Sequence, residues 1–98
     1  MITSKQIQNS YNDLYECIHE YIWPFEFVND LANLEVSVYN TFPNVKEVRG
    51  NFDKVASSCQ KYQKIKDDKD LNKSLSSMKD LIYSDDTIYA KLNNQISE

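Results

Sequence analysis

With 98 residues, 41% of them hydrophobic and 27% charged, the chain has the size and composition of one globular domain spanning 1–98. One glycine, one histidine and two cysteines exclude a glycine-rich phosphate-binding loop, a zinc cluster and a histidine-based triad, so we expect no enzyme, metal or cofactor. Apolar runs fall short of the roughly 20 residues of a membrane span, and the net charge of −4 argues against general nucleic-acid binding.

Segment 4–22 carries apolar residues at alternating steps of four and three, which is typical of an amphipathic helix. These residues are Ile7, Tyr11, Leu14, Ile18 and Tyr21. Thr3 and Gln6 have the spacing of a capping box, which predicts a helix start near Ser4.

Trp23 and Pro24 predict the end of this first helix, because the residue before a proline disfavours helical geometry. The apolar spacing nevertheless continues in register through Phe25, Val28 and Ala32. Either the chain turns a corner here or one long helix kinks. We favour a corner between two helices.

Segment 25–41 reads as a second helix, although LEVSVY at 34–39 also fits the alternation of a strand. A polar stripe at steps of four and three favours the helix; it comprises Glu26, Asp30, Asn33, Ser37 and Asn40. Two adjacent apolar stripes flank it, one of them formed by Phe27, Leu31, Leu34 and Val38. We therefore expect this helix to be the most buried element.

A third helix is predicted over 45–66, opened by a capping box of Asn44 and Glu47. Its apolar stripe contains Val45, Val48, Phe52, Val55, Cys59 and Tyr62. Gly50 lies within this pattern and should cost about 1 kcal/mol relative to alanine. We expect a close helix contact or a local kink at this glycine.

The last helix is predicted over 71–96, with Asp70 as its N-cap after the acidic loop that begins at Asp67. Only Asp85 interrupts its apolar stripe, so the segment is either one helix or two helices split at that residue. The four segments together predict an all-α fold, a small antiparallel bundle of three to four helices with a corner or kink at Pro24.

Charge is distributed unevenly along the chain. Residues 1–43 contain six acids and one base, whereas residues 44–98 contain nine acids and ten bases. An acidic, aromatic-rich cluster in the first half is typical of a protein-recognition surface. The candidate partner-binding residues are Tyr15, Glu16, Glu20, Trp23, Phe25 and Glu26.

These observations predict a non-enzymatic module that binds and occludes another protein, such as a small acidic inhibitor, immunity protein or adaptor. Self-assembly into a homo-oligomer is the alternative, because one small bundle need not bury four apolar stripes. A nucleic-acid-binding regulator is a third class, for which the lysines around Lys61 and Lys64 would have to serve.

Cys17 and Cys59 read as reduced thiols, with a single bridge between them as the alternative. The chain has ten lysines and one arginine, ten asparagines and eight isoleucines, which favours a low-GC bacterium, its phage or another mobile element as the source. We therefore expect a protein of the bacterial cytoplasm, with no membrane contact.

Overall fold

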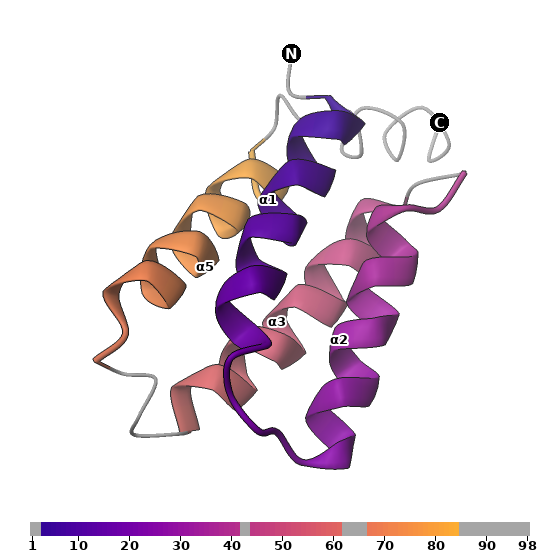
Figure 1. Cartoon of the computed structure of the whole chain (residues 1–98). Coiled ribbons are helices and arrows are strands. Elements are labelled where there is room, and N and C mark those ends of the chain that lie inside the picture. Colours follow the sequence, from indigo (N-terminus) through magenta and orange to yellow (C-terminus); the bar gives the residue numbers. More distant parts are fainter. Residues whose placement is uncertain (1–2, 42–43, 62–66, 85–98) are drawn as a thin grey trace.

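The computed structural model describes residues 3–41, 44–61 and 67–84. These residues form four helices and no strands (Figure 1): α1 (Ser4–Ile18), α2 (Phe25–Val38), α3 (Val45–Lys61) and α5 (Lys69–Ile82). LEVSVY is therefore helical up to Val38, and the all-α prediction is confirmed.

Successive helices run in alternating directions, so the described part of the chain is an antiparallel bundle (Figure 1). The bundle consists of two closely packed pairs. α1 packs mainly on α5 and α2 mainly on α3, whereas α1 with α2 and α3 with α5 meet over shorter stretches. Each helix contributes one apolar stripe to a common core, as its periodicity predicts.

Within the described ranges, the core contains the predicted apolar residues of α1, α3 and α5 and one of the two predicted stripes of α2. Its largest fully buried side chains include Ile7, Tyr11, Leu14, Leu34, Phe52, Leu71, Met78 and Ile82. Tyr11 places its ring in this core and donates a hydrogen bond from its hydroxyl to Glu35 Oε2 at 3.4 Å. Burial and the nearby carboxylate raise the pKa of this phenol well above its ordinary value.

Side chains cap the helices close to the predicted positions. Thr3 and Gln6 form the predicted capping box at α1, and Asn44 Oδ1 accepts hydrogen bonds from the amides of Lys46 and Glu47 at α3. The prediction for α5 is wrong by two residues, because Asp68 rather than Asp70 accepts the amide hydrogen bond of Leu71, at 3.0 Å.

Several helices end earlier than predicted. α1 ends at Ile18 instead of residue 22, and α2 at Val38 instead of residue 41. α5 ends at Ile82, where the amide of Tyr83 closes the last turn, so 71–96 is not one continuous helix. Residues 62–66, with Tyr62, and residues 85–98, with Asp85, lie outside the described residues.

The chain turns a corner between α1 and α2, as favoured from the Trp23-Pro24 pair. Residues 19–24 are not helical, and Pro24 occupies the N-cap of α2, where its fixed φ of −59° is compatible with helix entry. The carbonyl of Pro24 then accepts the amides of Phe27 and Val28. The apolar spacing of the sequence thus continues from α1 into α2, but the residues that continue it, such as Phe25 and Val28, face solvent instead of the core.

Gly50 neither approaches another helix nor takes an unusual conformation. A side chain added there would meet nothing within 4 Å, and the residue is exposed in the middle of α3. The expected close contact at this glycine is therefore wrong.

Candidate functional site

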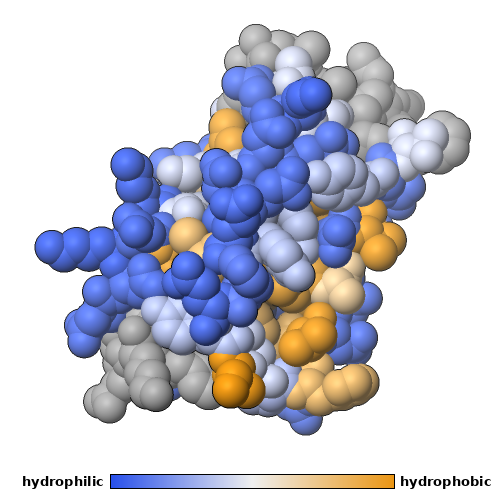
Figure 2. Space-filling view, viewed as in Figure 1, coloured by the Kyte–Doolittle hydropathy of each residue, from blue (hydrophilic) through white to orange (hydrophobic). Residues whose placement is uncertain are grey.

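The most unusual surface of the protein is the outward side of α2, where apolar side chains face solvent. Phe25 is 85% exposed, Val36 66% and Val28 51%, and Ala32 is also exposed. We call these four residues the outer stripe and the buried row of Phe27, Leu31, Leu34 and Val38 the inner stripe. Figure 2 shows the hydrophobic surface along α2, beside the hydrophilic surface of α1.

Two further exposed residues extend the outer stripe at its ends. Ile22, in the corner before α2, is fully exposed, and Tyr39, at the C-cap of α2, is nearly half exposed. The expectation that α2 would be the most buried element therefore fails on this side, because only one of its two apolar stripes enters the core.

Aromatic rings connect the outer stripe to α1. Tyr39 meets Tyr11 edge to face at 6.4 Å between ring centroids, and its hydroxyl donates to Asn12 Oδ1 at 3.1 Å. The half-exposed ring of Tyr15 lies beside Tyr11 at 6.3 Å and stacks on His19 at 5.9 Å. The aromatic surface therefore continues from the C-terminal end of α2 along α1.

On its other side, α1 borders an acidic hollow shared with α5. The hollow has a volume of about 420 Å³ and is lined by Asp13, Glu16, Cys17, Glu20, Asp68, Asp70 and Ser74. Five of these seven side chains are carboxylic acids, and none is basic. An uncompensated negative potential is expected at this surface.

Asp68 is a structural member of that hollow. One of its carboxylate oxygens caps α5, and the other accepts a hydrogen bond from the hydroxyl of Tyr21. The Tyr21 hydroxyl, followed by the Leu71 amide, lowers the pKa of Asp68 below its ordinary value. The same hydrogen bond raises the pKa of Tyr21 to about 12. This pair ties the chain after α1 to the start of α5.

Trp23 holds the corner together and presents little surface to a partner. Its indole Nε1 donates to the Ile18 carbonyl at 2.8 Å, its ring stacks on Phe27 with centroids 3.9 Å apart, and Tyr21 packs edge-on at 6.0 Å. These contacts explain why Trp23 is only partly exposed and give it a role in the fold.

The six residues predicted to bind a partner are distributed over four places. Tyr15 and Phe25 lie on the α1–α2 side, and Glu16 and Glu20 line the acidic hollow. Trp23 packs inside the corner, and Glu26 is exposed about 100° around α2 from Phe25. The prediction missed Val36 and gave no binding role to Val28 and Ala32, although the second apolar stripe of segment 25–41 was the signal for them.

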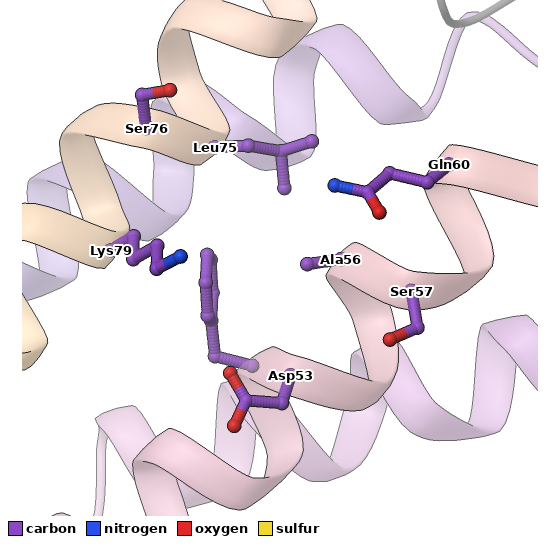
Figure 3. Close-up of a pocket in the computed structure, with 8 residues that line it drawn as sticks. Asp53, Ala56, Ser57, Gln60, Leu75, Ser76 and Lys79 are labelled. Atoms are coloured by element: carbon purple, nitrogen blue, oxygen red, sulfur yellow. The ribbon is translucent and has the colours of Figure 1, made fainter.

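A second hollow, of about 310 Å³, lies between α3 and α5 (Figure 3). Leu75 and Lys79 from α5 and Gln60 from α3 point toward it. Just beyond it, Tyr83 donates to Asp53 Oδ2 at 2.6 Å, and the Arg49 guanidinium lies over the Tyr83 ring. The lining groups are of mixed chemistry, with one acid, one base, an amide, two hydroxyls and apolar side chains, and the histidine of the chain is not among them.

The two cysteines are free thiols in different surroundings. Cys59 is completely buried in α3, and burial raises the pKa of its thiol to about 12. Cys17 is partly exposed, with its sulfur 3.7 Å from Ser74 Oγ across the α1–α5 interface. Cys59 therefore acts as a small core side chain.

Within the described ranges, no three His, Cys, Asp or Glu side chains are grouped so that they could hold a metal ion. No helix in those ranges combines the length and apolar character that crossing a membrane requires. Comparisons with protein-family models, with curated proteins and with solved structures find no match to this chain.

Proposed function

We propose that this protein is a non-enzymatic binding module that covers a surface of another protein with the face formed by α1 and α2. The outer stripe carries the proposal, because its four apolar residues are all exposed along one side of α2. Large exposed apolar patches are rare on monomeric proteins and usually mark an interaction site. The rings of Tyr15 and Tyr39 enlarge this face with amphipathic side chains that interfaces favour.

Occlusion is the mechanism that this face supports. A helix with an exposed apolar ridge can lie across a partner's groove or active site and exclude water from it. Small inhibitors, immunity proteins and adaptors act in this way and need no reaction chemistry of their own. We place the protein in that class, acting in the cytoplasm of a low-GC bacterium, where free thiols such as Cys17 and Cys59 persist.

Self-association is the second candidate, and the same outer stripe favours it. Two copies could bury their stripes against each other in an isologous dimer. Light scattering over a wide range of protein concentration separates the two candidates. A molar mass that stays at that of one chain excludes self-assembly. A mass that doubles for the wild type at high concentration, but not for a variant with polar residues in the outer stripe, supports it.

The decisive experiment compares the wild type with the triple variant F25S/V28T/V36T in affinity capture from bacterial lysate. All three side chains are exposed, so the fold should survive. A matched control, K46S/K73S/S76T, changes three exposed residues of α3 and α5. We expect one partner to be retained by the wild type and the control but lost by the stripe variant. Equal capture by all three proteins would contradict the proposal.

A further inference from the structure

The charged side chains of α1 and α2 are almost all acidic. α2 contains Glu26, Asp30 and Glu35 and has neither lysine nor arginine. The α1 helix adds Asp13 and Glu16, and its one base, the Lys5 side chain, lies in the first turn. Four of these five acids are exposed, and Asp30 is partly exposed. Glu35, which accepts from Tyr11, and the acids of α1 therefore border the apolar row on its α1 side. Asp30 lies toward α3, in a hollow that also contains Lys54 and Lys61.

The acidic hollow extends this border to the far side of α1. Asp13 and Glu16 of α1, together with Glu20 in the turn after it, meet Asp70 of α5 around one depression. Its lining contains no lysine or arginine. Across the face, from the α1–α5 groove to α2, the surface thus changes from carboxylates to aromatic rings to aliphatic side chains. The α1–α2 face is therefore amphipathic, and its polar side is acidic.

We infer that the α1–α2 face binds a basic amphipathic helix, which lays its apolar side on the outer stripe and its lysines and arginines over the carboxylates of α1. This inference rests on the proposed function and names the class of partner. Helix-in-groove recognition reads apolar residues at i, i+3, i+4 and i+7. From Phe25 to Val36 the stripe extends roughly 16 Å, about three turns of a partner helix.

The same charges argue against the other occupants of this face. A second copy docked by two-fold symmetry would bring the acids of both copies together, and like charges across an interface are unfavourable. Nucleic acid and anionic lipid surfaces would meet the same repulsion. A basic helix satisfies the apolar row and the carboxylates at once.

A synthetic peptide tests the inference directly. The peptide is a helix of about 18 residues with leucine at i, i+3, i+4 and i+7 and lysine elsewhere, carrying a fluorophore for anisotropy. One control peptide has the same composition in shuffled order, and another has glutamate in place of lysine. We expect one peptide per chain, binding that weakens as salt increases, and at least about tenfold weaker binding of either control.

Protein variants assign the two parts of the surface. F25S/V28T/V36T should weaken the lysine peptide about tenfold, and E16K/E20K/E26K should weaken it by at least as much while reducing its salt dependence. The control E47K/D67K/D80K changes the net charge equally at exposed sites on α3, the following loop and α5. It should change binding less than about threefold. Far-ultraviolet circular dichroism and Trp23 emission verify folding.

The inference is overturned if the amphipathic lysine peptide fails to bind, if the shuffled or glutamate peptide binds as tightly, or if the control reversal weakens binding as much as E16K/E20K/E26K. Failure here is separable from failure of the proposed function. A cellular partner that the stripe variant loses, together with no binding of the lysine peptide, refutes the basic helix and leaves the binding module. If F25S/V28T/V36T captures the same proteins as the wild type, the proposed binding module is itself refuted.

Discussion

The two apolar stripes of α2 differ in side-chain size and in environment, because the inner stripe has two leucines where the outer stripe has a valine and an alanine. Leu34 and Val38 of the inner stripe are completely buried between α2 and its neighbours, whereas Val28 and Val36 of the outer stripe are more than half exposed. The stripe with the larger apolar side chains enters the core, and the other stripe stays in contact with solvent. The corner meets the inner stripe where Trp23 stacks on Phe27, and this stripe packs in the core between α2 and its neighbours.

Truncation of one residue from each stripe gives the largest expected contrast. Leu34→Ala should lower the free energy of unfolding by about 3 kcal/mol, because it leaves a cavity in the core. Val36→Ala should change it by less than about 0.5 kcal/mol, since the exposed side chain packs on little. Urea denaturation followed by circular dichroism measures both. Similar losses for the two variants would show that the outer stripe is buried.

The corner itself can be weakened at Trp23. Trp23→Ala removes the stack on Phe27 and the hydrogen bond to the Ile18 carbonyl, and should lower the free energy of unfolding by about 2 kcal/mol. Trp23→Phe keeps a ring over Phe27 and loses only the N–H donor, so about 1 kcal/mol is expected. If both variants were as stable as the wild type, Trp23 would not hold the corner.

Asp68 ties the chain after α1 to the bundle, and its contribution depends on pH. Because its pKa in the folded protein is lowered, its ionised form stabilises the fold above the ordinary value of 3.8. This stabilisation is lost as the pH falls through that value toward the lowered pKa. Asp68→Ala should cost about 1 kcal/mol at neutral pH through the lost N-cap alone.

Asp68→Asn separates the charge from the cap, because asparagine is also a good N-cap but does not titrate. Between pH 5 and pH 3, the free energy of unfolding of Asp68→Asn should fall less than that of the wild type. The difference between the two falls measures what ionised Asp68 contributes to stability. Urea denaturation at each pH gives the comparison. If the stability of both proteins fell equally with pH, Asp68 would not contribute to the acid sensitivity of the protein.

The sequence predicts the inside of this protein better than its surface. The spacing of Ile7, Leu14, Phe52 and Met78 identifies the core, because burial of one side of each helix imposes a period of about 3.6 residues. Helix ends were less accurate. Periodicity continues past Ile18 to Tyr21, but Tyr21 packs from a turn, where its hydroxyl reaches Asp68.

The candidate site was only partly predictable, because it depends on how helices are rotated relative to one another. Segment 25–41 has two stripes that could each face the core, and periodicity does not show that only one of them is buried. Trp23 and Phe25 are close in sequence, but this does not place them on one surface. The corner turns the indole inward onto Phe27 and leaves Phe25 outside.

Gly50 gives the smallest effect and the clearest contrast with the outer stripe. Both are exposed on helices, but the stripe is apolar surface that a partner can use, whereas the glycine only raises the backbone entropy of the unfolded chain. Gly50→Ala should therefore raise the free energy of unfolding by roughly 0.5–1 kcal/mol, since the new methyl group meets nothing within 4 Å. Thermal unfolding followed by circular dichroism measures the gain. A loss of stability would mean that α3 needs glycine at this position. Gly50 lies on α3, outside the α1–α2 face, so the variant should bind the lysine peptide as tightly as the wild type.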